Sequence, residues 1–144
     1  MKTVPRLSRV LGLFLAVLCL TAAAATASSL EEVRQRGVIR HLGLPYANFI
    51  TGQGDGLDVE LIKLFAAHLG VRYEFVPTDW GTIIGDLTGK TIAVKGADVQ
   101  VTGQAPVKGD LLANGLTVLA WREKILDFST PTFPTQVWLV VKSD

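Results

Sequence analysis

The stretch "GDGLDVELIKLFAAHLGVRYEFVPTDW", residues 54–80, decides the fold, because its pattern changes from helix to strand at one glycine. A helical period predicts a helix from 57 that Gly70 ends. One face of this helix collects large apolar residues: Leu57, Leu61, Leu64, Phe65 and Leu69. The alternating stretch "VRYEFVP", residues 71–77, then predicts a strand that Pro77 closes. A helix feeding directly into a strand is half of a βαβ unit.

The first strand of this βαβ unit is predicted upstream, before residue 45. Ser29 and Glu32 have the spacing of a capping box, which predicts a short helix over 30–36 that Gly37 ends. The apolar stretch "VIRHLGL", residues 38–44, predicts a strand. "PYANFITGQGDG", residues 45–56, is a loop, because it contains Pro, Asn, Asp and several glycines.

Downstream, the elements continue to alternate. We expect a short helix in 79–89, a strand within 110–118, and a final apolar strand over 136–142. Strands alternating with helices indicate an α/β fold with a mostly parallel sheet and flanking helices. Ligands bind such sheets at the carboxyl ends of the strands. Tyr46, Trp80 and residues 114–117 all follow predicted strands, so the sequence predicts a pocket there.

A second stretch, "NGLTVLAWREKILDFSTPTF", residues 114–133, places Arg122 after a mostly apolar run with a hydroxyl at Thr117. A guanidinium and a hydroxyl lining one pocket could hold a carboxylate. The alternative is an ordinary surface arginine beside Glu123 and Lys124, since arginine is mostly exposed. The residues by themselves leave both interpretations open.

The first 27 residues have the three parts of a secretory signal. Lys2, Arg6 and Arg9 give a basic start, residues 10–20 form an apolar core, and Ala25-Thr26-Ala27 offers a cleavage site. Cleavage there would leave 117 of the 144 residues, 28–144, and would remove Cys19, which is the single cysteine. We therefore expect an exported domain, periplasmic or extracellular, without disulfides.

Composition excludes several classes of function. Without the three basic residues of the signal, 11 Lys and Arg face 13 Asp and Glu, a net charge of about −2. No basic patch predicts nucleic-acid binding, and no second apolar stretch after the signal is long enough to span a membrane. No metal-ligand cluster, phosphate-binding loop or catalytic triad stands out, and His41 and His68 fit structural roles. We expect no cofactor, no metal and no enzyme activity.

Four segments, in order, resemble the extracellular solute-binding proteins of family 3, the amino-acid binding proteins of ABC importers. They are "LGLPYANF", the 54–80 stretch, "GLTVLAWREKILDFSTP" and "VWLVVKSD". The third is the most specific, because it is similar to the family's signature around Arg122. The resemblance implies a periplasmic-binding-protein-like (type II) lobe over 28–144. It also implies a chain that holds the first lobe without the second, which would supply a carboxylate for the ligand's ammonium.

Residue by residue, the resemblance implies a ligand site. It puts Arg122 and Thr117 on the ligand's α-carboxylate and Gly115 near its ammonium. Tyr46 and Trp80 fall on aromatic positions that sandwich the ligand's side chain, although core packing would also explain Trp80. Together with the loop position of Asn114, the predicted substrate-binding residues are Arg122, Thr117, Gly115, Tyr46, Trp80 and Asn114.

The chain also departs from the family pattern. Leu119 replaces a frequent second hydroxyl, and Ala120-Trp121 replace Pro-Glu at the rim of the pocket. Gly43 stands where some binders of cationic amino acids carry an acid, which argues against a lysine or arginine ligand. Residues 91–107 are an extra stretch that predicts a β-hairpin, either a decoration or a flap that binds a partner.

The resemblance implies binding of a small carboxylate-bearing solute, probably an amino acid, for import through the membrane permease of an ABC importer. Two alternatives share the fold, because fold alone does not decide function. One is a sensory or regulatory ligand-binding lobe. The other is a dehydratase or a lobe associated with a lytic transglycosylase.

Overall fold

The computed structural model describes residues 28–135 and 140–142. The expected signal peptide, 1–27, therefore lies outside the described residues, as does most of the expected strand over 136–142. Residues 140–142, which the sequence predicts as the end of this strand, have no regular secondary structure.

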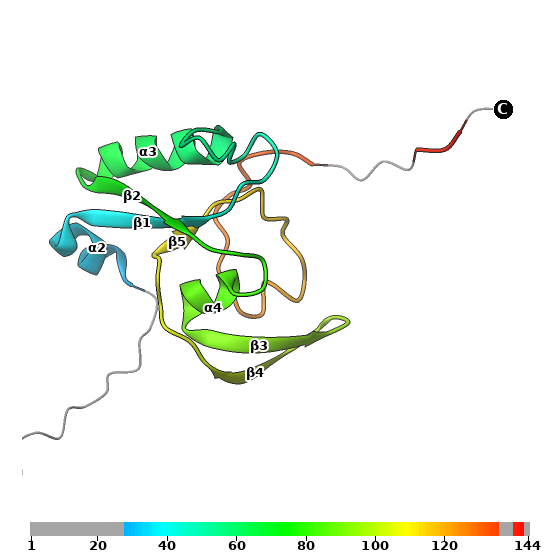
Figure 1. The fold of residues 1–144 in the computed structure, drawn as a ribbon. Helices are drawn as coiled ribbons and strands as arrows, with labels where there is room; N and C mark the ends of the chain where they lie inside the picture. Colours follow the sequence, from blue (N-terminus) through cyan, green and yellow to red (C-terminus); the bar gives the residue numbers. More distant parts are fainter. Residues whose placement is uncertain (1–27, 136–139, 143–144) are drawn as a thin grey trace, which may run out of the picture.

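A three-stranded parallel sheet forms the centre of the domain, in the order β2-β1-β5. The middle strand β1 (Val38–Gly43) pairs along its whole length with β2 (Arg72–Pro77). On its other side His41 and Leu42 pair with the two residues of β5 (Leu111–Leu112). The predicted parallel α/β architecture is confirmed, and the carboxyl ends of all three strands meet at one edge (Figure 1).

Local sequence signals set the helix ends. The predicted capping box of Ser29 and Glu32 opens α2 (Leu30–Arg36), and left-handed Gly37 ends it. Gly70 ends α3 (Leu57–Leu69) in the same conformation. Helix α4 (Ile83–Thr88) is short, and in Figure 1 the sheet lies between α3 and α4.

Helix α3 packs with a face other than its row of large apolar residues. The side that is buried carries Asp58, Val59, Ile62 and Ala66. Four of the five residues that the sequence places on one apolar face remain exposed: Leu57, Leu61, Leu64 and Phe65. Both faces contain apolar residues at helical spacing, so periodicity alone could not decide which one meets the sheet.

The extra stretch forms the expected hairpin. Strands β3 (Lys90–Lys95) and β4 (Asp98–Gln104) pair in antiparallel fashion as a separate two-stranded sheet. Figure 1 shows the hairpin beyond α4, on the side away from α3.

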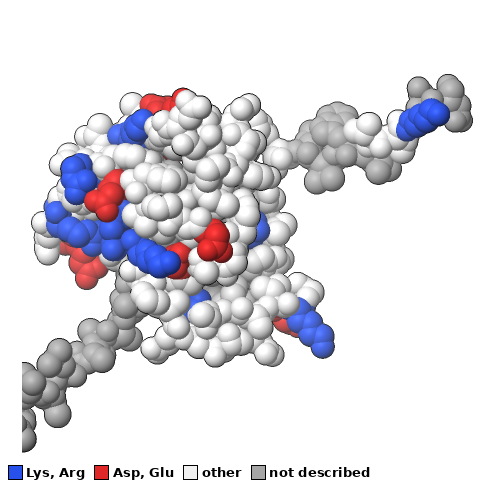
Figure 2. Space-filling view, in the orientation of Figure 1, with Lys and Arg blue, Asp and Glu red and all other residues white. Residues whose placement is uncertain are grey.

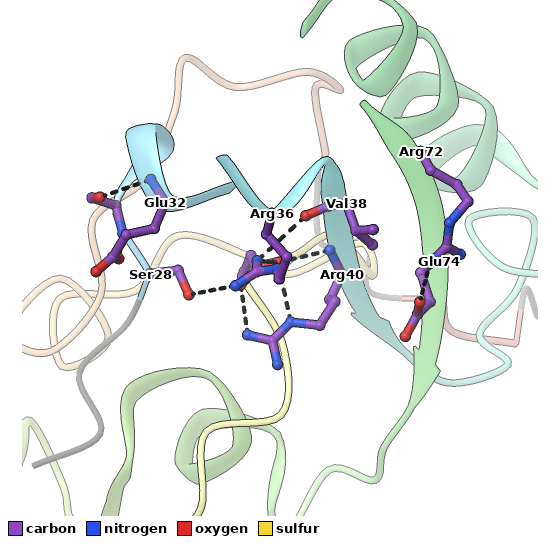
Figure 3. Close-up of polar contacts among 9 residues, drawn as sticks. Ser28, Glu32, Arg36, Val38, Arg40, Arg72 and Glu74 are labelled. Carbon is purple, nitrogen blue, oxygen red and sulfur yellow. Dashed lines mark hydrogen bonds and ion pairs between the residues drawn. The ribbon is translucent and has the colours of Figure 1, made fainter. Parts of the chain in front are cut away.

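A buried carboxylate joins α2, β1 and the segment that enters β5. Asp110, whose side chain is 2% exposed, accepts from Arg36 at 2.5 Å and from Arg40 at 2.7 Å. Burial alone would raise the pKa of Asp110, but hydrogen bonds from Arg40, Ser28 and Arg36 outweigh it and leave that pKa lowered. Figure 3 shows Arg36 and Arg40 side by side, and Figure 2 shows charged side chains gathered on the side of the molecule that holds α2.

Asp110→Asn should destabilise the fold by roughly 2 kcal/mol, because it leaves the partly buried Arg40 and the exposed Arg36 without their buried carboxylate. The matched control is Glu74→Gln, which breaks an exposed pair with Arg72 and should cost less than about 1 kcal/mol. Urea unfolding of both variants gives the free energies. Equal losses would contradict the structural role of Asp110.

Candidate functional site

Three loops meet at the carboxyl edge of the sheet and enclose an open hollow of about 300 Å³. They follow β1, β2 and β5, as expected for parallel strands. The hollow is lined by Tyr46, Trp80, Gly115, Leu116, Thr117 and Arg122. The structure thus brings together all the residues singled out in the sequence except Asn114, and it adds Leu116.

Arg122 is the charged residue of this lining. Its Nη1 donates to the backbone carbonyl of Thr117 at 2.8 Å, and its guanidinium lies 5.1 Å from the ring centre of Trp121. Its Nε is buried and has no hydrogen-bond partner among the described residues. Burial lowers the pKa of Arg122, and within the described part of the chain no carboxylate pairs with it. The site holds a cation whose charge is uncompensated there.

The aromatic side of the hollow differs from the arrangement that the resemblance implies. Tyr46 and Trp80 contact each other edge to face, with ring centres 5.5 Å apart and planes at 88°. Behind them Tyr46 stacks on Phe49 at 6.2 Å. The two rings form one continuous apolar surface, so a ligand would lie against them and not between them.

A tight turn presents Tyr46. Its N–H donates to the carbonyl of Ile50 at 2.9 Å, and the N–H of Ile50 returns to the carbonyl of Tyr46 at 3.3 Å. Ala47, inside this turn, has a φ of 46°. Ile50 is buried while Tyr46 is 45% exposed, so the turn anchors its apolar end and leaves the aromatic ring at the hollow.

Three buried polar groups hold three consecutive residues at the start of the Arg122 loop. His41 Nε2 lies 2.6 Å from the carbonyl oxygen of Ala113. The side chain of Asn114 accepts from the N–H of Leu44 at 2.8 Å. Asp58 accepts from the N–H of Gly115 at 2.6 Å. Strand β1, the loop after it and helix α3 thereby each fix one residue of this segment.

Asn114 therefore stands apart from the other residues singled out in the sequence. It is fully buried and lies outside the lining of the hollow. Its side-chain oxygen holds the loop after β1, while its Nδ2 has no partner among the described residues. In this structure it positions the loops.

Sequence reasoning missed Asp58, because an acid in the first turn of a helix is an ordinary surface feature. It expected a structural role for His41 and did not foresee the contact with Ala113. Since a carbonyl only accepts, Nε2 of His41 carries the proton, and Tyr73 donates to Nδ1 at 3.0 Å. Burial lowers the pKa of His41, so the neutral ring is the stable form.

Metal and membrane features are absent from the part of the chain that the structure describes. Within residues 28–135 and 140–142, no three His, Cys, Asp or Glu side chains come together as a possible metal site. The described helices are all too short or too polar to cross a membrane.

Comparison with known proteins gives one family and several relatives. Residues 42–105 match the model of the bacterial extracellular solute-binding proteins, family 3. The L-cystine-binding protein TcyJ of Escherichia coli (strain K12) is 31% identical over 120 residues, covering 78% of this chain. The chain spans 38% of the length of that relative.

Several solved structures have a similar fold. An ancestral cationic amino acid solute-binding protein, AncCDT-1, is 35% identical with a TM-score of 0.56, covering 72% of this chain and 40% of that one. An ancestral cyclohexadienyl dehydratase is 33% identical with the same TM-score, covering 76% of this chain and 40% of that one. Domain 1 of the arginine-binding TmArgBP has a TM-score of 0.52 at 23% identity and covers 73% of this chain and 72% of that one, so it shows the fold of a single lobe.

Stability should fall as the pH drops below about 6.5, the ordinary pKa of histidine. Burial lowers the pKa of His41 in the folded state, so the unfolded chain binds more protons in this window. Urea unfolding between pH 8 and pH 5 measures the effect. His68→Gln, a change at an exposed residue, should keep the decline, and His41→Gln should remove it. A decline that survives in His41→Gln would assign the titration to another group.

Gly115→Ala should destabilise the loop by more than the same substitution destabilises the hairpin turn at Gly96. Gly115 has a φ of 60°, and an added Cβ would lie 2.6 Å from the ring of Phe49. Gly96 has a φ of 63° with nothing within 4 Å, so Gly96→Ala carries the backbone cost of roughly 1 kcal/mol alone. Thermal unfolding compares the two variants. Equal losses would show that Phe49 yields freely.

Proposed function

Because the chain is a partial member of the bacterial extracellular solute-binding proteins of family 3, we propose that it binds a small carboxylate-bearing solute, an amino acid, outside the cytoplasm. In this proposal residues 1–27 are a signal peptide and 28–144 form one lobe of a solute-binding domain. The bound solute would be delivered to the permease of an ABC importer.

The guanidinium of Arg122 carries this proposal. It lines the hollow, it is partly desolvated, and one of its buried nitrogens has no partner within the described residues. Unpaired buried donors are costly, and a planar guanidinium matches a carboxylate in bidentate geometry. A carboxylate in the hollow would supply both the missing charge and the missing acceptor.

The rest of the lining favours an amino acid over a simple anion. Tyr46 and Trp80 offer an aromatic surface next to Arg122, which suits an apolar or cationic side chain. Thr117 supplies a hydroxyl on the Arg122 side, and Gly115 supplies backbone at the edge of the hollow. A ligand with a carboxylate at one end and a bulky group at the other would use both sides.

The dehydratase relative raises an enzymatic alternative. Among the described residues, the lining offers no carboxylate, histidine or thiol as a general base, and its one titratable group besides Arg122 is the phenol of Tyr46, so the residues present fit binding better than proton transfer. A sensory lobe would use the same residues and differ only in the protein that reads the bound state. Binding is therefore the common element, and transport is its family-based extension.

Binding should raise the unfolding midpoint, by an amount equivalent to about 2.7 kcal/mol at a hundredfold excess over Kd. The probes are two matched pairs, L-cystine with cystamine and L-arginine with agmatine, in which the second member lacks the carboxylates. Where one pair responds, only its carboxylate-bearing member should shift the midpoint. Arg122→Ala should raise the Kd of the ligand that responds by about 10- to 100-fold, because a charge-assisted contact is lost.

The control variant is Glu123→Ala, which removes an exposed neighbouring charge and should leave affinity unchanged. Arg122→Lys keeps the charge, loses the fork, and should bind less tightly than the unmodified chain. Equal shifts by cystine and cystamine, or equal affinity in Arg122→Ala, would overturn the assignment of Arg122 to a carboxylate.

A further inference from the structure

The segment that carries Thr117 and Arg122 is held firmly at both ends. It begins at Gly115, whose N–H donates to the buried carboxylate of Asp58 at 2.6 Å. It ends at Leu126, which is 8% exposed and belongs to the core. Between them Val118 and Leu119 are 43% and 40% exposed, so burial fixes the middle of the segment only weakly.

Hydrogen bonds within the segment shape it without attaching it. Arg122 and Glu123 donate their N–H groups to the carbonyl of Leu119, at 2.8 and 3.1 Å. Ile125 and Leu126 donate to the carbonyl of Arg122, at 3.0 and 2.8 Å. These bonds form a compact turn around Arg122, which could still move as a unit relative to the sheet.

Lys124 attaches this turn to a different element. Its Nζ donates to the carbonyl oxygen of Ala97 at 2.8 Å and to the carboxylate of Asp98 at 3.2 Å. Ala97 lies in the turn between β3 and β4, and Asp98 begins β4. The partner of the Arg122 turn is thus the tip of the β3–β4 hairpin.

The hairpin is attached to the rest of the domain at the end opposite its tip. Its base is fixed to α4, because the N–H of Ala105 donates to the carbonyl of Gly89 at 2.9 Å. Just beyond, Lys108 pairs with the buried carboxylate of Asp86 at 2.9 Å. Its apolar residues share one face, because Ile92 pairs with Val101 and Val94 with Val99: the apolar face is Ile92, Val94, Val99 and Val101. Cross-strand apolar pairs of this kind stabilise the pairing of the two strands.

We propose that the β3–β4 hairpin positions the anion-binding turn, with Lys124 as the positioning residue that connects the hairpin tip to Arg122. The proposal rests on the function proposed above and gives the hairpin a role within the chain, in place of decoration or a flap for a partner. Lys124 lies outside the lining of the hollow, so it would act on the ligand only through the placement of Arg122.

The contacts set the size of the effect. Lys124 is 49% exposed and Asp98 is 83% exposed, so water and salt screen their charge interaction. The bond to the Ala97 carbonyl does not depend on a second charge. Loss of Lys124 should therefore weaken ligand binding by roughly two- to fivefold, while Asp98→Asn should have a smaller effect.

Amide hydrogen exchange tests the proposal without any ligand, so its outcome does not depend on the proposed function. Lys124→Met should speed exchange in peptides covering 116–126 by at least about twofold, with peptides from β1 and α3 unchanged. The matched control is Lys95→Met, at an exposed lysine next to the same hairpin turn; its backbone pairs with Asp98, and its side chain makes no hydrogen bond among the described contacts. It should leave exchange in 116–126 as it is.

A second arm measures Kd for L-cystine and L-arginine in the same variants. Weaker binding in Lys124→Met with an unchanged unfolding midpoint would support positioning and exclude a general loss of stability. Identical exchange in Lys124→Met and Lys95→Met would overturn the proposal even if ligands bind. Faster exchange with no binding by any variant would leave the support intact and refute the function of the site.

Discussion

Three buried polar contacts at Ala113, Asn114 and Gly115 are the constraint on which the site depends. Each comes from a different part of the fold: His41 in β1, the N–H of Leu44 after β1, and Asp58 in α3. A buried polar group without a partner costs free energy, so these contacts specify one arrangement of the loops. These contacts fix the path of the chain as it leaves β5, and that path brings Thr117 and Arg122 next to Tyr46 and Trp80.

The local parts of this structure could be read from the sequence, and the non-local parts could not. The capping box at Ser29 and the glycine ends at Gly37 and Gly70 lie next to the elements they end, so their signals are short-range. The contact of Asp58 with Gly115 joins residues 57 apart in the chain. Nothing near Asp58 in the sequence indicates that partner.

The same limit explains the face of α3 and the residues of the hollow. Leu61 and Ile62 both belong to apolar rows, and only the position of the sheet decides that Ile62 is buried. Tyr46, Trp80, Thr117 and Arg122, which strand ends and the resemblance single out, all line the hollow. They could not give the edge-to-face contact of Tyr46 and Trp80, because ring orientation depends on packing with Phe49.

Buried contacts hold residues 113–115 at the start of the site, whereas the following segment with Thr117 and Arg122 is partly exposed. This difference affects how tightly the site can bind a ligand. In an open hollow each charge-assisted bond is weakened by water, so little binding energy can be spent on ordering the protein. A guanidinium that is already held by Thr117 and stacked near Trp121 needs less ordering than a free arginine. An exposed turn gains most from outside support, because few buried contacts oppose its opening. Lys124 attaches the turn around Arg122 to the hairpin tip. Among the described residues, this turn makes no hydrogen bond with the buried polar groups that hold residues 113–115, so the hairpin supports a part of the site that those groups do not.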